Sequence, residues 1–264
     1  MRLREHLRDP LYRSAYALMA STVLTALLGV GFWALAARTA SAREIGRDAV
    51  LISSLITLSS ICQLNLVDAL VRFLPGVRNR DRSRRIAAAY AASAAAGLLG
   101  GTAFVLGAPR VSARLAFLQG DRATAVVFVA AMGLWGIFVL QDAVLTALRR
   151  ATWLPAENAA YSLAKIALLP LVLAAGSAHT VFLAWVLPTL VVVPVINILL
   201  HVRVLRPAAR SAPDAAARRL ELRGRGLARF MLQDYAGFVL GQSAITLVPL
   251  VVIARLGSEQ SAWF

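Results

Sequence analysis

Ionisable side chains occur inside stretches of the chain that are otherwise apolar, and they are the residues most able to do chemistry. Asp68 and Arg72 stand four residues apart, the spacing at which an acid followed by a base pairs along one helix face. Asn158, Tyr161 and Lys165 recur at helical intervals as a polar stripe. Because charge in lipid is costly, such groups usually face a protein interior or a water-filled path.

A purely structural interpretation of the same residues stays open. Arg72, Glu157 and Asp234 lie near the ends of apolar stretches, where long side chains reach the membrane interface. Asp142 and Lys165 lie deeper, and they could pair with each other as a link between two helices.

The sequence holds no grouping typical of an enzyme. Cys62 is the only cysteine, and the three histidines, His6, His179 and His201, are scattered without metal-ligand spacing. There is no Ser/His/Asp grouping and no glycine loop of the kind that holds phosphates. We therefore expect no catalysis, no metal and no cofactor.

Composition predicts a membrane protein. Apolar residues make up 59% of the 264 residues, and the mean hydropathy is +0.70, well above the roughly 45–50% apolar content of soluble domains. Seven stretches are long enough, or nearly so, to cross the hydrocarbon core as helices. The sequence thus predicts an all-α integral membrane bundle of about seven transmembrane helices. The stretches are Ser14–Ala37, Ala49–Leu70, Ile86–Leu106, Ala125–Leu148, Ala159–Ala175, Val181–Leu200 and Ala236–Ile253.

Arginine placement predicts the orientation. The formal net charge is +15, which in a soluble protein would suggest nucleic acid. Here the arginines fall between the apolar stretches, so we expect no nucleic-acid partner. Twenty of them lie at the N-terminus and in alternate gaps, against seven in the other gaps. The positive-inside rule then places the N-terminus in the cytoplasm of a multi-pass protein in the cytoplasmic membrane.

The polar positions predict a cleft that opens toward the cytoplasm, lined by the second, fourth, fifth and seventh apolar stretches. The gap from His201 to Arg229 is long and basic and contains Pro207 and Pro213. We expect a six-helix lobe over residues 1–200, a cytoplasmic inter-lobe loop over 201–229, and the first helix of a truncated second lobe over 230–264.

The ends of the helices resemble one family. The segments are ALAARTASAREIG (34–46), NLVDALVRFLP (65–75), AVLTALRR (143–150), ENAAYSLAKIALLPLVLAAG (157–176) and TLVPLVVIARLGSEQSAWF (246–264). This pattern is similar to the N-terminal half of the polysaccharide and oligosaccharide-lipid flippases of the multidrug/oligosaccharidyl-lipid/polysaccharide exporter superfamily. The resemblance implies two six-helix lobes around a central cavity, and this chain lacks nearly all of the second lobe. A second lobe or a second copy would complete the transporter.

The same resemblance implies a function. It implies alternating access that moves lipid-linked saccharide precursors across the cytoplasmic membrane for cell-envelope polysaccharide, including lipopolysaccharide, with membrane lipids as the other partners. Cations would then hold the phosphates, because Arg binds them as a fork and Lys as a point charge. The candidate substrate-binding residues are Arg72, Lys165, Asp68, Asp142, Asn158, Gln242 and Arg38.

Two alternatives remain open. One is a drug/cation antiporter of the same superfamily, which needs acids without basic partners deep in its cavity. The other is a scaffold subunit of a polysaccharide assembly complex that transports nothing.

Overall fold

The computed structural model describes residues 10–63, 65–111, 121–210, 235 and 237. The chain divides into two compact units, Met1–Glu221 and Leu222–Phe264, and the architecture below is that of the first unit. Within it, the described residues form helices and turns and no strand. The prediction of an all-α membrane bundle is therefore confirmed.

Six helical segments are long and apolar enough to cross a membrane, and they correspond to the first six predicted stretches. The seventh, Ala236–Ile253, lies outside the described residues. The elements are α2 (Pro10–Thr39), α3 (Ala42–Cys62), α4 (Leu66–Phe73), η1 (Leu74–Gly76), α5 (Asn79–Val111), α7 (Arg122–Ala147), η3 (Ala151–Trp153), α8 (Leu154–Ala174), α9 (Thr180–Val186), α10 (Thr189–Leu200), η4 (His201–Leu205, a π-helical turn) and α11 (Arg206–Arg210).

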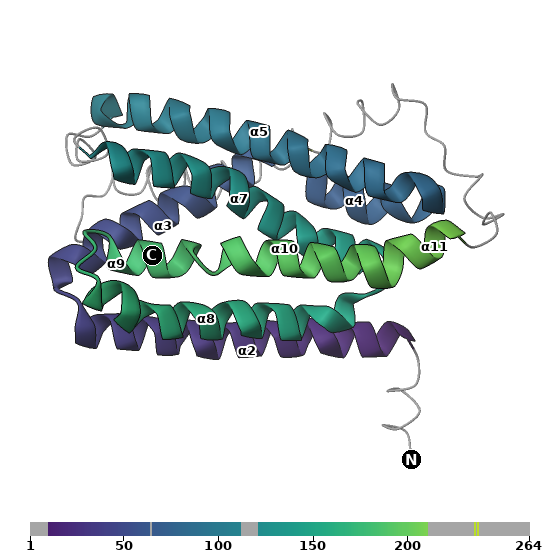
Figure 1. The fold of residues 1–264 in the computed structure, drawn as a ribbon, viewed down its shortest axis with the longest axis horizontal. Helices are drawn as coiled ribbons and strands as arrows, with labels where there is room; N and C mark the ends of the chain where they lie inside the picture. Colours follow the sequence, from purple (N-terminus) through teal and green to yellow (C-terminus); the bar gives the residue numbers. More distant parts are fainter. Residues whose placement is uncertain (1–9, 64, 112–120, 211–234, 236, 238–264) are drawn as a thin grey trace, which may run out of the picture. The chain divides into compact units, whose positions relative to one another are not determined.

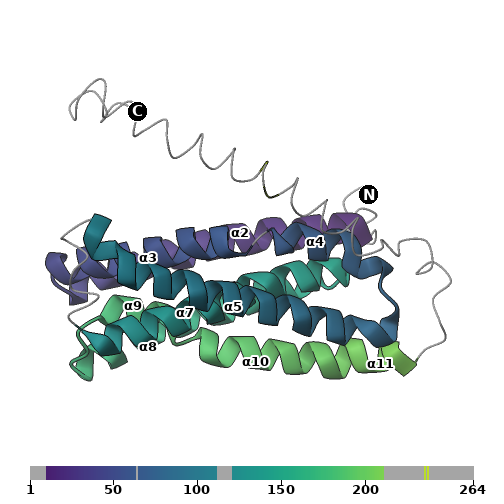
Figure 2. The same cartoon turned by 90° about the horizontal axis from the view of Figure 1, so that it is seen from above.

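The long helices run side by side along one axis (Figures 1 and 2). The closest neighbours are α5 with α7 and α2 with α8. One end of the bundle carries α4, η3 and α11, and we call it the α4 end. The other end carries the α2–α3 connection and the first turns of α7 and α9, and we call it the α9 end (Figure 1).

Two of the predicted helices are broken. The second stretch was predicted as one helix, but α3 ends at Cys62 and α4 starts at Leu66. Asn65 between them has φ 57°, a left-handed conformation that a continuing α-helix does not contain and that Asn tolerates better than most residues. The sixth stretch is broken between α9 and α10 at Leu187 and Pro188. Proline has no N–H to donate within a helix, although Pro194 lies inside α10 without a break.

Side-chain hydroxyl groups donate hydrogen bonds to two backbone carbonyls beside the break at Pro188. The Tyr161 hydroxyl, from α8, donates to the Trp185 carbonyl at 3.0 Å. The Thr189 hydroxyl donates to the Val186 carbonyl at 2.6 Å. Carbonyl groups at membrane depth must find protein partners, and these two bonds supply them. The break is thus tied to α8.

The predicted start of the inter-lobe loop at residue 201 is wrong. Helical structure continues from His201 to Arg210 through η4 and α11. Leu205, in η4, is buried and packs in the cluster that contains Leu200 and Ala147. Burial of this apolar side chain stabilises the extra helical turns.

Helix α5 approaches α7 closely at Gly97 and Gly101, the two glycines of a GxxxG motif. A Cβ atom on Gly97 would lie 2.7 Å from the Met132 carbonyl oxygen of α7, and one on Gly101 would lie 3.1 Å from Met132 Cγ. Small residues of this kind allow helix backbones to approach closely in membranes.

We therefore predict that Gly97→Ala destabilises the protein, because the added methyl group meets backbone that cannot move aside. The expected cost is about 1–3 kcal/mol, measured as a lower Tm of the purified protein in detergent. Gly107→Ala is the matched control in α5, since nothing lies within 4 Å of a Cβ there. An equal Tm for both variants would contradict the close-packing interpretation.

Candidate functional site

An open cleft of about 510 Å³ lies between α2, α7 and α8. Asn158 of α8 donates from Nδ2 to Ser21 Oγ of α2 at 3.1 Å across it. Asp142 of α7 contributes a carboxylate. The lining residues are Leu18, Ser21, Thr22, Thr25, Ala26, Asp142, Leu154 and Asn158. The predicted cleft shares α7 and α8 with this one, but α2 lines it where the second apolar stretch was expected.

Next to the cleft lies a group of buried oxygen atoms without hydrogen-bond partners. Glu157 is 2% exposed, and neither of its carboxylate oxygens has a partner. The same is true of Asp142 Oδ1 and of the Tyr90 hydroxyl of α5. Leu154 and Asn158, on either side of Glu157 in the sequence, line the cleft together with Asp142, and Tyr90 packs against the apolar cluster that contains Ala143 and Leu154.

Lys165 lies two turns further along α8, among aromatic rings. Its Nζ lies 3.9 Å from the centre of the Trp185 ring, 5.1 Å from that of Phe32 and 5.2 Å from that of Tyr161. Those rings come from α9, α2 and α8, and Trp135 of α7 lies against Trp185 at 6.2 Å between ring centres. The side chain of Lys165 is 2% exposed, and cation–π attraction partly offsets its loss of water.

Within the described part of the chain, Lys165 makes no ion pair with Asp142 or with any other acid. The alternative in which these two residues lock α7 to α8 is therefore wrong.

The other candidate residues lie apart from the cleft. Asp68 and Arg72 are exposed on α4, and the Arg72 guanidinium lies 5.7 Å from the centre of the Phe73 ring. Arg38 is exposed near the last turn of α2, at the α9 end. Gln242 and Asp234 lie outside the described residues.

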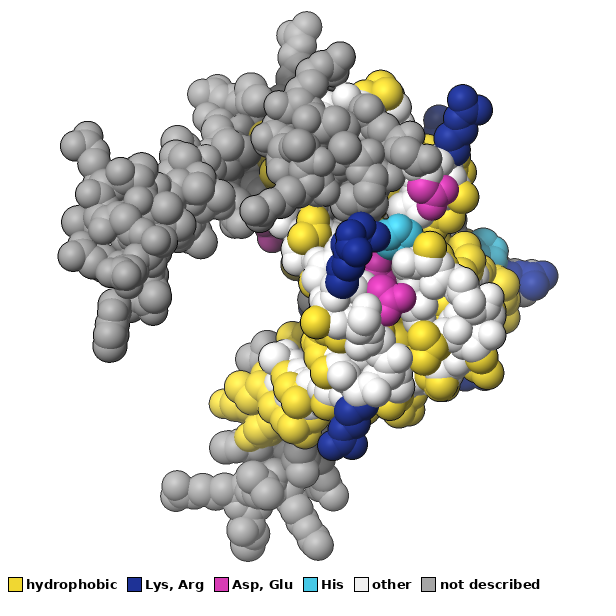
Figure 3. All heavy atoms as spheres, turned by 90° about the vertical axis from the view of Figure 1, so that its left-hand side faces the viewer, with side chains coloured by type: hydrophobic (Ala, Val, Ile, Leu, Met, Phe, Trp, Pro, Cys, Tyr) yellow, Lys and Arg dark blue, Asp and Glu magenta, His cyan; other side chains and the backbone are white. Residues whose placement is uncertain are grey.

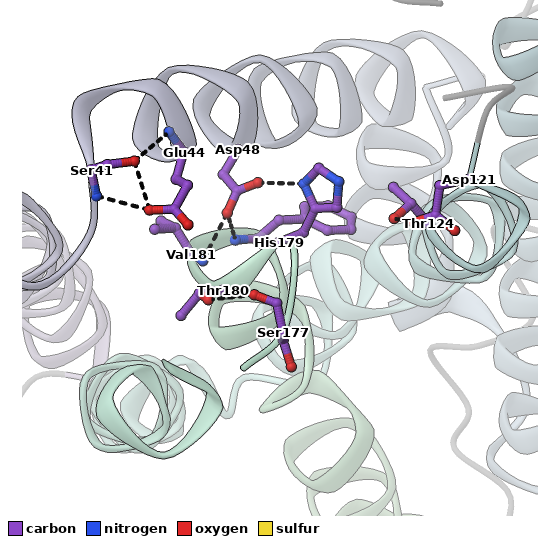
Figure 4. Close-up of polar contacts among 10 residues, drawn as sticks. Ser41, Glu44, Asp48, Asp121, Thr124, Ser177, His179, Thr180 and Val181 are labelled. Atoms are coloured by element: carbon purple, nitrogen blue, oxygen red, sulfur yellow. Dashed lines mark hydrogen bonds and ion pairs between the residues drawn. The ribbon is translucent and has the colours of Figure 1, made fainter. Parts of the chain in front are cut away.

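A buried carboxylate that the sequence did not single out joins helices at the α9 end. Asp48 of α3 is 1% exposed. Its Oδ2 accepts from the backbone N–H groups of Val181 at 2.8 Å and Phe182 at 3.1 Å. Its Oδ1 accepts from His179 Nδ1 at 2.7 Å. Asp48 thus caps α9 from a different helix, as Figure 4 shows.

Further polar contacts surround this cap. Ser41 and Glu44 form a capping box at the start of α3, with Glu44 Oε2 accepting from the Ser41 N–H at 2.9 Å. Asp121 caps α7, and its hydrogen bond from the Thr124 hydroxyl lowers the pKa of that carboxyl. Charged side chains and histidine gather on this end of the bundle in Figure 3.

The sequence gives little indication that Asp48 is buried. Asp48 immediately precedes the predicted stretch Ala49–Leu70, where a charged residue at a helix end is ordinary. Its partner His179 is 131 residues away, and nothing in the spacing joins the two.

We predict that Asp48→Ala destabilises the bundle by about 2–3 kcal/mol, because it leaves the first N–H groups of α9 and His179 without an acceptor. Thermal unfolding in detergent measures this as a lower Tm. Glu44→Ala is the control, since it removes a capping carboxylate that is exposed, and its cost should stay near 1 kcal/mol or below. Equal losses would show that the buried cap adds nothing.

Comparison of the chain with protein-family models, with curated proteins and with solved structures gives no match.

Proposed function

We propose that this protein is a flippase-like transporter that moves lipid-linked oligosaccharide or polysaccharide precursors across the cytoplasmic membrane by alternating access, for synthesis of cell-envelope polysaccharide. The observation that carries the proposal is Lys165, a buried ammonium group that aromatic rings surround and no described acid neutralises. A purely structural lysine in a membrane helix normally has an anionic or carbonyl partner.

The chemistry of Lys165 fits an anionic headgroup. A phosphate that approached the ammonium would supply the missing negative charge at a place where water screens little. Aromatic rings beside a cation also suit a saccharide, because their apolar faces and polar edges match sugar rings that carry both kinds of surface. Phe32, Tyr161 and Trp185 supply such faces around Lys165.

The cleft supplies hydrogen bonds suited to sugar hydroxyls. Ser21, Thr22 and Thr25 of α2 offer hydroxyl groups, and Asn158 offers an amide. A bundle with such a wall shelters a hydrophilic headgroup from hydrocarbon while its lipid tail stays outside.

Arginine placement supports the membrane and orientation in this proposal. With the N-terminus in the cytoplasm, the α4 end with its arginine-rich neighbouring segments faces the cytoplasm. The lining residues Asp142, Leu154 and Asn158 lie toward that end of their helices, which suits loading from the cytoplasmic leaflet.

One observation favours the second candidate, a drug/cation antiporter. In the sequence, the basic neighbour of Asp68, Arg72, leans mildly against it. Glu157 and Asp142, in contrast, are acids inside the spans that form no ion pair with the described residues. An antiporter of organic cations would use such acids, and efflux of a cationic dye from cells that express the protein would support it.

We predict that Lys165→Met reduces flipping at least about tenfold without lowering stability, because methionine fills similar space and removes only the charge. The assay follows a fluorescent saccharide linked to a lipid pyrophosphate across reconstituted vesicles. Tm in detergent is measured in parallel and should stay the same or rise, since a buried charge is costly.

The controls separate a phosphate role from general electrostatics. Arg72→Ala should also reduce flipping if Arg72 contacts phosphate, whereas Arg80→Ala, at an exposed arginine of the next helix, should leave flipping unchanged. Lys165→Arg should retain part of the activity. Normal flipping by Lys165→Met would remove the basis of the proposal.

A further inference from the structure

We propose that the junction of α5 with η4 and α11, at the α4 end, is a binding site for one anionic phospholipid of the surrounding membrane. Arginines of the junction hold the phosphate of the headgroup, and an apolar stripe on α10 and η4 holds an acyl chain. These elements neither line the cleft nor surround Lys165, so the site does not depend on the function proposed above.

The first ground is that two segments far apart in the sequence bring arginines to one place. The elements η4 and α11 pack against α5, and α11 lies beside the start of α5 in both views (Figures 1 and 2). The buried side chains of Ile86 from α5 and Leu205 from η4 belong to one apolar cluster. The contact therefore brings together the four arginines that lie within two residues of Ile86 or Leu205, which are Arg84, Arg85, Arg203 and Arg206.

The second ground is that these four guanidinium groups form no ion pair with an acid in the described part of the chain. All four side chains are exposed. Asp81 is the acid nearest to them in the sequence, and it pairs with none of them. Arg82, in contrast, serves the fold, because it donates to the carbonyls of Val77 at 3.1 Å and Pro75 at 3.0 Å. The arginines of the junction thus present their donors to a partner outside the described chain.

The third ground is an apolar stripe that leads to the junction. Val191, Val195, Ile198 and Val202 recur at the spacing of one helix face, and each is at least 46% exposed. They lie in a segment that is long and apolar enough to cross a membrane. Arg206 follows Val202 after four residues. A phospholipid has the same order of parts, since a charged headgroup at the membrane surface is followed by an apolar chain.

The chemistry of the junction indicates the class of lipid. Arginine binds phosphate oxygens through two parallel N–H groups, and basic sites between membrane helices bind anionic headgroups. A zwitterionic lipid carries its own cation beside the phosphate, which weakens its attraction to a group of arginines. Free phosphate has the charge but no chain for the stripe. The positive-inside rule explains arginines at this end in general, but it does not explain their convergence on one junction.

The test measures the Tm of the purified full chain in a nonionic detergent while phosphatidylglycerol is added in mixed micelles. We expect Tm to rise by about 5 °C near saturation, because the lipid binds the folded state. Phosphatidylcholine at the same mole fraction should leave Tm nearly unchanged. Inorganic phosphate should do the same, and this arm distinguishes a lipid headgroup from a free oxyanion.

Variants assign the response to the junction. Arg85→Gln combined with Arg206→Gln removes one arginine from each segment. The mole fraction of phosphatidylglycerol needed for half of the stabilisation should then rise at least about tenfold, because two charge-assisted contacts are lost. Arg149→Gln combined with Arg150→Gln is the matched control. It removes the same charge from two exposed arginines before η3, which packs on α2, α7 and α8, and it should keep the wild-type response.

If the first double variant does not purify, Arg84→Gln combined with Arg203→Gln tests the same junction. Three results would overturn the proposal. The first is a Tm that phosphatidylglycerol raises no more than phosphatidylcholine does. The second is equal stabilisation by inorganic phosphate, and the third is an equal loss of response in the junction variants and in the control. None of these results bears on flipping through Lys165, which is assayed separately in vesicles.

Discussion

The cost of placing charged or polar atoms in an apolar bundle governs every polar feature of this protein. Where polar atoms join helices, partners meet that cost. Asp48 accepts hydrogen bonds from two backbone N–H groups and from His179, and the Trp185 carbonyl accepts one from a hydroxyl group at the break in its helix. Glu157 has no hydrogen-bond partner, and at Lys165 the aromatic rings offset the cost only in part. Neutral atoms of Ser93, Gln141, Ser162 and Trp185 also lack partners, but Glu157 and Lys165 are buried ionisable groups, for which the cost is larger.

Much of the fold follows from the length of the apolar stretches, because a helix is the only open chain conformation that satisfies its own backbone in lipid. Six of the predicted spans match six helical segments. The breaks at Asn65 and Pro188 did not follow from the same pattern. Hydropathy averages over a window about as long as a span, so one residue with φ 57° or one proline leaves the average unchanged. The helical continuation to Arg210 was also missed. Arginines beside Leu205 lower the mean hydropathy of this segment, so the burial of Leu205 did not show in the sequence.

The site was predictable in part. Helical spacing correctly grouped Asn158 with Lys165 on one helix, and Asp142 stood out as a deep charge. The contribution of α2 was missed because Ser21, Thr22 and Thr25 have short hydroxyl side chains, which bond to their own helix as readily as they face a cleft. Asp68 and Arg72 were chosen from spacing along a single helix, which carries no information on which neighbour, if any, covers that face. Whether two acids share a basic partner depends on three helices at once, so only the structure could show that Glu157 and Asp142 have none among its described residues.

The break at Pro188 has a consequence for how motion reaches the buried ammonium. Trp185 lies one turn before that break and provides the ring nearest to Lys165, while its carbonyl is fastened to Tyr161, another ring of the same group. This hydrogen bond therefore ties the backbone of α9 beside the break to the same helix that carries Lys165. A movement of α10 at Pro188 would leave the indole and the ammonium together, whereas a movement of α9 against α8 would separate them and change the fluorescence of Trp185.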